Sequence, residues 1–107
     1  MKRFISNYTI FPSGEEVVNH ITTINDDGTM RSVEPFDREL GNTIYVPQPL
    51  CIVAIGDMPQ VEQVFHESPS RAYFKKKLVE LNATKPQPDT LVAVMKLDFA
   101  HNILNQL

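Results

Sequence analysis

The sequence contains few of the residues that small proteins use for covalent or metal cross-links. Its 107 residues include one cysteine, Cys51, which excludes an internal disulfide and the common structural zinc sites. Tryptophan is absent, with three tyrosines and six phenylalanines, so the composition indicates no aromatic cage or base-stacking platform. The four glycines are dispersed, and no glycine-rich phosphate loop is present.

Charge and hydrophobic length argue against two further classes of partner. Ten Lys and Arg against 13 Asp and Glu give a formal charge of -3. Since that balance lacks a basic field for a nucleic-acid backbone, we expect no nucleic-acid partner. No apolar run approaches the roughly 18 residues of a transmembrane helix, so we expect no membrane partner. The basic pair Lys2-Arg3 is followed by Ser6, Asn7 and Thr9, which is not the pattern of a secretion signal. The lone cysteine makes the reducing cytoplasm the default compartment.

The length predicts one domain, residues 1–107, and is too short for a catalytic barrel of about 250 residues. Its strand-rich part is residues 1–56. Pro12-Ser13-Gly14 favours a turn, and Asp27-Gly28 between two apolar runs is a strong hairpin signal. Leu50–Ile55, the longest apolar run, suits a buried strand. The predicted strands are 4–11, 17–25, 29–34, 43–46 and 50–55.

Residues 57–82 are expected to form a helical insert. Asp57 and Gln60 form a variant capping box with Pro59 between them, followed by apolar residues at helical spacing. Pro69 ends this first helix, and Ser68 is expected to cap a second one with Pro69 at its first position. The remaining expectations are Lys75–Lys77 near the end of that helix, a stop at Asn82, a strand within 89–99, and a short helix or frayed tail at 101–107.

The three histidines are the first candidates for a metal site. His20, His66 and His101 are scattered, and no His-x-His or His-x-x-x-His pair is present. A zinc hydrolase often has two histidines close in sequence. We therefore interpret these histidines as ordinary surface or core residues, and we predict no metal and no cofactor.

Other reactive residues also have a simpler interpretation. Cys51 lies in an apolar strand, where burial raises a thiol pKa and opposes nucleophilic catalysis. Asp26-Asp27-Gly28 resembles the start of a calcium loop but lacks its later ligands, so a turn is favoured. Lysines 75–77 point in different directions on a helix and predict a solvated face. No spacing predicts an acid/base pair or any catalytic residue among the carboxylates Glu15, Glu16, Glu34, Asp37 and Glu39.

One larger pattern resembles a known family. Tyr8–Pro12 leads into Gly14, then Val17–Met30 with Asp27-Gly28 at its turn, and then Val33-Glu34. This resembles the N-terminal segment of amidohydrolase-type metal-dependent hydrolases. In those proteins a strand, a Gly-bearing turn, a second strand and a Gly-centred hairpin precede the catalytic barrel. Two further segments resemble the next part of the chain in some members, and the resemblance covers about half of this sequence: Glu39–Val46 and Leu50-Cys51.

The resemblance implies a fold without the family's activity. In the family these strands join C-terminal strands in an accessory sandwich, the composite domain, and here Leu91–Asp98 would be the returning strand. The family's His-x-His pair is missing after Leu50-Cys51, and the barrel is absent. No catalytic or metal-binding residue is therefore carried over.

These observations predict an α+β fold, a small antiparallel or mixed β-sheet or sandwich with a helical insert near residues 58–82. Three functions remain open. The first is a non-catalytic interaction or structural domain; the second is a small-molecule binding module with a pocket between the 58–82 helices and the sheet. The third is an enzyme, alone or as a piece of a split hydrolase acting in trans. The expected core is Ile10, Val18, Ile21, Ile24, Met30, Val33, Ile44, Ile52, Val53, Phe65, Phe74, Leu78, Val92, Val94 and Leu97.

Self-association or a protein partner is the expected mode of interaction. A sheet this small must have edges, and edges carry unpaired backbone groups. The N-terminal strand carries little charge beyond Lys2 and Arg3. We expect it to be either covered by the helices or paired across a symmetric dimer, with the dimer favoured.

Overall fold

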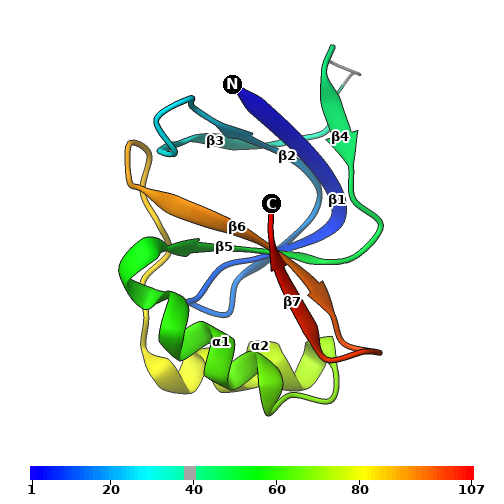
Figure 1. Cartoon of the computed structure of the whole chain (residues 1–107), viewed down its shortest axis with the longest axis vertical. Helices are drawn as coiled ribbons and strands as arrows, with labels where there is room; N and C mark the ends of the chain where they lie inside the picture. Colours follow the sequence, from blue (N-terminus) through cyan, green and yellow to red (C-terminus); the bar gives the residue numbers. More distant parts are fainter. Residues whose placement is uncertain (38–40) are drawn as a thin grey trace.

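The computed structural model describes residues 1–37 and 41–107 (Figure 1). In these residues five strands come first, a short 3-10 turn at Ile55–Asp57 and two α-helices follow, and two more strands end the chain. The elements are β1 (Lys2–Ile10), β2 (Glu16–Ile24), β3 (Met30–Pro35), β4 (Thr43–Tyr45), β5 (Leu50–Ala54), α1 (Met58–His66), α2 (Arg71–Leu81), β6 (Val92–Asp98) and β7 (Ile103–Gln106).

The strands form one mixed sheet in the order β3-β2-β1-β5-β6-β7. β1 pairs parallel with β5 and, nearer its start, with β4, whereas the other neighbours are antiparallel. Figure 1 shows β1–β3 above, β5 and β6 in the middle, and both helices below. The predicted α+β class with a helical insert is confirmed. Neither helix in the described residues has the length and apolar character needed to cross a membrane.

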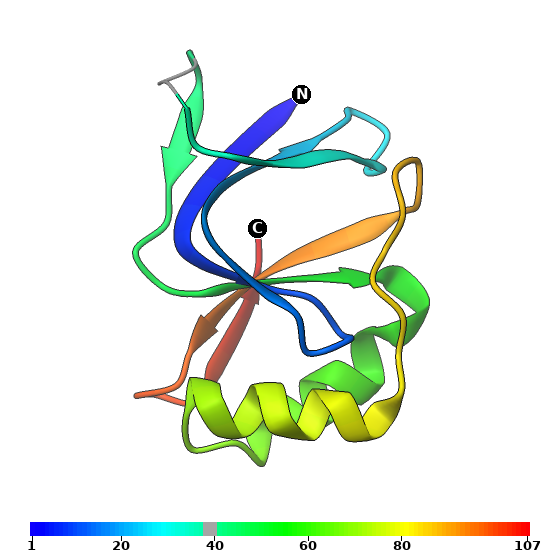
Figure 2. The same ribbon diagram turned by 180° about the vertical axis from the view of Figure 1, so that it is seen from behind.

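The sheet curls so that the β2–β3 turn meets the start of β6 (Figure 2). Thr29 at the β2–β3 turn bridges Leu91, just before β6. Met30 N–H donates to Thr90 C=O at 2.9 Å, and Val92 N–H donates to Gly28 C=O at 3.1 Å. These contacts between residues about 60 positions apart hold the tip of the β2–β3 hairpin against the start of β6 and enclose an inner face.

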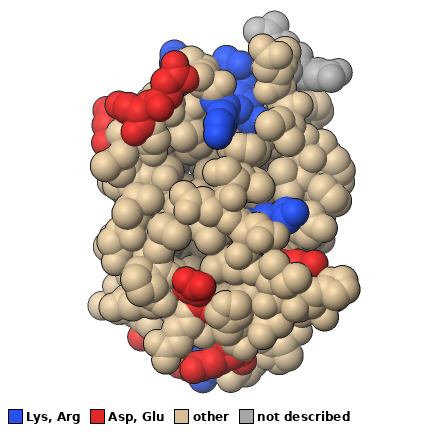
Figure 3. Space-filling view, viewed as in Figure 1, with Lys and Arg blue, Asp and Glu red and all other residues tan. Residues whose placement is uncertain are grey.

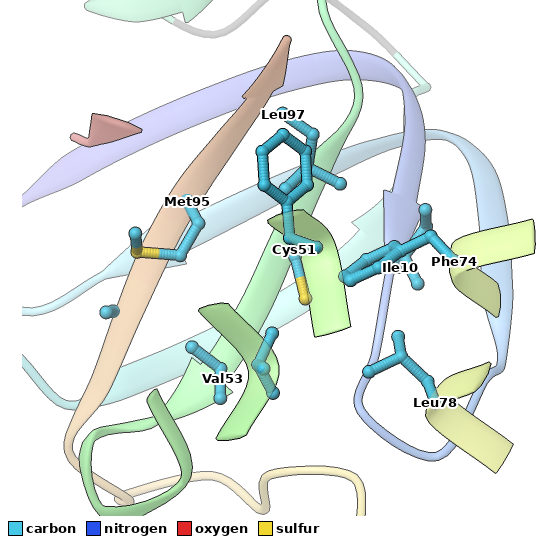
Figure 4. Close-up of a cluster of buried hydrophobic side chains, with 10 residues drawn as sticks. Ile10, Cys51, Val53, Phe74, Leu78, Met95 and Leu97 are labelled. Carbon is cyan, nitrogen blue, oxygen red and sulfur yellow. The ribbon is translucent and has the colours of Figure 1, made fainter. Parts of the chain in front are cut away.

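Curling divides the core into two layers. One lies between the sheet and the helices, where Cys51, Phe74 and Leu78 are fully buried (Figure 4). The other fills the inner face of the curled sheet and contains Phe4, Phe11, Leu50, Ile52 and others. β5 separates the layers because its alternate side chains point to opposite faces of the sheet. This explains its continuous apolar sequence.

Most of the predicted core is buried, but two members are wrong. Val18 is 54% exposed and Ile44 is 52% exposed, and Val33 is only partly buried. The face of the sheet that carries Val18 contacts α2 through Tyr8 and Glu16 but leaves Val18 uncovered, and β4 lies away from both helices (Figure 1). A β-branched residue on such a face fits the strand without entering a core.

The predicted hairpin is confirmed as β2 and β3, with Gly28 at a φ of 87° in the turn. The turn after β1 is also confirmed, and Gly14 adopts a φ of 89° there. A Cβ on Gly14 would lie 2.5 Å from Val79 Cγ2 of α2. Glycine is therefore needed at residue 14 for both its conformation and its approach to the helix.

The predicted helix starts need correction. Ser68 does not cap α2: its hydroxyl donates to Val64 C=O at 2.6 Å. Instead Ser70 is the N-cap, and its Oγ accepts from Tyr73 N–H at 3.2 Å. Asp57 precedes α1 but its side chain makes no capping bond, because the 3-10 turn gives it a helical backbone and an N-cap residue needs an extended one.

Two further details of the helical insert concern α2. Lysines 75–77 lie in the middle of α2, not near its end. Asn82 ends α2, as predicted, and adopts the left-handed conformation that is common at helix ends.

Two expectations about the first and last strands are also wrong. Residues 103–106 form β7 instead of a helix or frayed tail, because they pair with β6. β1 is not an edge strand: it pairs with β2 along one side and with β4 and β5 along the other. The long-range parallel pairing that makes β1 central leaves no local sequence pattern. The ends of the strand order are β3 and β7.

Candidate functional site

The three histidines lie in separate elements. His20 is on β2, His66 ends α1, and His101 lies in the β6–β7 turn. His66 contacts Asn102 Oδ1 at 3.2 Å, and His101 contacts Asp98 Oδ2 at 2.9 Å and thereby lowers the pKa of that carboxyl. Within residues 1–37 and 41–107, no three His, Cys, Asp or Glu side chains come together as metal ligands.

Cys51 lies at the centre of the layer between sheet and helices (Figure 4). It is fully buried, and desolvation raises the pKa of its thiol to about 12. Because the thiolate is the nucleophile, this cysteine is chemically inert in the folded protein.

We expect the folded protein to resist iodoacetamide at pH 8 and to react rapidly once unfolded in guanidinium chloride. Burial blocks access to Cys51 and suppresses its thiolate, and unfolding removes both effects. Intact-mass spectrometry over time checks this. Alkylation of the folded chain at the rate of the unfolded chain would show that the thiol is accessible.

Glu15 and Glu16 form ion pairs with basic residues of α2 and of the connector after it. Glu16 accepts from Lys75 at 3.2 Å, and its other oxygen lies 3.0 Å from Arg71 Nε. The Arg71 guanidinium lies 3.5 Å from the centre of the Tyr8 ring. Glu15 pairs with Lys85 at 3.3 Å. Charged groups that composition alone assigns to the surface therefore tie distant elements together.

The remaining acidic candidates are turn or surface groups. Asp27 accepts from Thr29 N–H at 3.0 Å and from its hydroxyl at 2.6 Å, which lowers the pKa of Asp27. Asp26 pairs with the amino group of Met1. Glu34 and Asp37 are exposed, and Glu39 lies outside the described residues. The turn interpretation of Asp26-Asp27-Gly28 agrees with these contacts.

The sequence predicts a pocket between the helices and the sheet, but packed side chains occupy that space. That space is filled by Phe65, Phe74 and Leu78, each with no exposed surface. A hollow of about 250 Å³ instead opens between the β1–β2 end of the curled sheet and β6. Its apolar lining residues are Phe4, Ile24, Val92, Val94 and Leu107, and the polar ones include Lys2, Asn25 and Asp26.

The edge strand β7 is the second candidate site. Leu107 N–H donates to Val94 C=O at 2.9 Å. Because hydrogen-bonded pairs alternate along an antiparallel ladder, the amides of Ile103 and Asn105 point towards β6. The backbone groups of Leu104 and Gln106 therefore point away from the sheet. No described strand pairs with this side of β7.

The two sheet edges differ in how they are protected. β3 contains Arg31, Glu34 and Pro35, which are charged or proline residues of the kind that blocks strand addition. β7 has the sequence Ile-Leu-Asn-Gln, without charge or proline.

No family model matches the sequence, and no curated protein or solved structure matches it either. The two candidate sites therefore depend on their geometry alone. Sequence reasoning missed both, although each has a signal in the sequence. For the hollow, the signal is the basic residue Lys2 two positions before the apolar Phe4. For the edge strand, it is the run of six residues without a charged side chain at 102–107.

Proposed function

We propose that the chain is a non-catalytic interaction domain that assembles with a second copy of itself through β7. One observation carries this proposal: β7 is an edge strand with neither charge nor proline. Unprotected edges are templates for strand addition. The occupant is a second copy because an antiparallel pair of identical edges satisfies both strands at once about a two-fold axis.

The side chains of β7 support one register for this pair. If the axis passes through Asn105, the outward groups of Leu104 in one copy meet those of Gln106 in the other. Ile103, which is 46% exposed, then lies opposite Leu107 of the second copy, which is 37% exposed. Cross-strand apolar pairs of this kind stabilise antiparallel strands. The register thus covers both exposed apolar residues of the β7 segment.

The short overlap predicts a weak dimer. Four residues bury far less surface than the roughly 1,200–2,000 Å² of a stable complex. We expect a dissociation constant on the order of 100 µM, typical of a transient contact. Assembly would therefore respond strongly to local concentration. The proposal also assigns the protein to the reducing cytoplasm, where its one free thiol remains reduced.

Asn105→Lys is expected to weaken the dimer at least about tenfold, because two like charges would face each other on the axis. Asn105 is exposed and lies opposite Lys96 of β6, so the new lysine should cost the monomer no more than about 1 kcal/mol and leave it folded. Sedimentation equilibrium up to millimolar concentration checks this. The matched control is Thr84→Lys on the exposed connector before β6, which adds the same charge and should leave association unchanged.

Two results would contradict the proposal. One is a strictly monomeric parent chain over the whole concentration range. The other is equal weakening by both lysine variants, which would indicate general charge repulsion instead of pairing through β7. Circular dichroism and thermal unfolding of each variant establish that the monomer is intact.

The resemblance to the accessory domain of amidohydrolase-type hydrolases supports a non-catalytic role but stays a prediction. Such a domain without its barrel would have no chemistry of its own and would act through contacts. The alternative of a split hydrolase acting in trans predicts a stable complex with a separate barrel protein. Self-assembly through β7 and binding of such a barrel are distinguishable, because only the first is lost in Asn105→Lys.

A further inference from the structure

The hollow at the end of the curled sheet has apolar walls. Phe4, Ile24, Val92 and Val94 line it, and each of these residues is at most 8% exposed. They belong to the inner core layer. A cavity of about 250 Å³ with such walls accepts the hydrocarbon body of a small organic molecule.

One basic side chain, that of Lys2, lines the hollow, and two arginines lie near the same end of β1 without lining it. Lys2 lies on the same face of β1 as Phe4, because side chains two residues apart in a strand share a face. The guanidinium groups of Arg3 and Arg31 approach the sulfur of Met1, at 3.3 and 4.0 Å. Three of the ten basic residues thus gather near the N-terminus. Figure 3 shows Lys and Arg side chains at the top of the molecule beside a group of Asp and Glu side chains.

Two acidic side chains near the mouth are already engaged. Asp26 pairs with the Met1 amino group, and Asp27 accepts two hydrogen bonds from Thr29. By contrast, the Lys2 side chain makes no hydrogen bond or ion pair with any residue in 1–37 or 41–107. Its ammonium is the positive charge that remains for a ligand at the rim of the hollow.

We propose that the hollow binds a small organic carboxylate, with its apolar body against Phe4, Ile24, Val92 and Val94 and its carboxylate at the ammonium of Lys2. An anion is favoured over a cation because the free charge at the rim is positive. A compact body is favoured because the walls enclose little volume. A charge-assisted hydrogen bond to the carboxylate fixes the orientation of the ligand. The hollow shares Leu107 with the proposed β7 interface, and substitutions at Lys2 test the hollow separately from that interface.

Three probes of similar size test the class of ligand: phenylacetate, 2-phenylethanol and 2-phenylethylamine. They share an aromatic body and differ in the charge of the head group. Titrations of the full chain followed by two-dimensional amide NMR should show saturable shifts at Val92 and Val94. We expect phenylacetate to bind at least about fivefold more tightly than the alcohol and the amine, since only the anion pairs with Lys2.

Lys2→Glu is expected to abolish this preference and to favour the amine instead. Lys2 is exposed, so the fold should persist. Lys96→Glu on β6 is the matched control, because residue 96 does not line the hollow and the preference for phenylacetate should remain. Absence of saturable shifts with phenylacetate would overturn the site. Equal binding of all three probes to the parent chain would overturn the role of Lys2.

Discussion

Leu78→Ala is expected to destabilise the protein by about 2–5 kcal/mol, the usual cost of removing a buried leucine side chain. Leu78 has no exposed surface and packs with Phe74 and Cys51 between α2 and the sheet (Figure 4). Truncation leaves a cavity where aromatic rings already interlock: the Phe65 and Phe74 centroids lie 6.0 Å apart. The free energy of unfolding in urea measures the effect.

Val79→Ala is the control for this prediction. Val79 lies next to Leu78 on α2 but is 61% exposed. Its truncation should change the free energy of unfolding by less than about 1 kcal/mol. Equal losses in the two variants would mean that α2 does not pack on the sheet through Leu78.

Thr9→Pro should destabilise the monomer by about 3 kcal/mol or more, a cost in the range of a proline that removes a backbone donor. Thr9 is fully buried and β1 is central in the sheet. Phe11 N–H donates to Glu15 C=O at 2.8 Å, and alternation along the antiparallel ladder then directs the Thr9 amide to Val17. Proline deletes this donor and leaves a buried acceptor unpaired.

Thr9→Val separates the backbone effect from the side-chain effect. Valine keeps the amide and the shape but removes the Thr9 hydroxyl, which is buried without a partner in the described structure. We expect the free energy of unfolding to stay the same or to rise, since an unpartnered buried hydroxyl is costly. Thermal and urea unfolding check both variants. A proline variant as stable as the parent would exclude a central position for β1.

Because β1 is central, Thr9→Pro is expected to destabilise the monomer itself. It is not expected to abolish a dimer while leaving the monomer unaltered. The low charge of the β1 residues is what suggests an edge strand in the sequence. Low charge indicates a strand that is protected from water but does not distinguish a central position from a dimer contact. The same property at β7, where no described strand pairs with the outer side, supports an interface.

Local patterns predict the elements that depend on neighbouring residues. The Asp27-Gly28 turn, the strand over Leu50–Ala54 and the two helices around Pro69 appear as expected. In each case the signal is a steric or periodic property of a few consecutive residues, such as the conformational freedom of glycine or the apolar spacing of a helix. Capping is less predictable, because Ser68 and Ser70 are equally suited by type and only the backbone path selects Ser70.

The amino-acid sequence by itself determined the α+β class, the buried β5 strand and the absence of a local His-x-His metal motif. Only the tertiary structure decided that β1 is central, that β7 is an edge and that Lys2 meets a hollow lined by Val94. Each of these depends on contacts between residues far apart in the chain, such as Thr29 with Leu91. Propensity and spacing act over a few residues, whereas the order of strands in a sheet is chosen by the total burial of the whole chain.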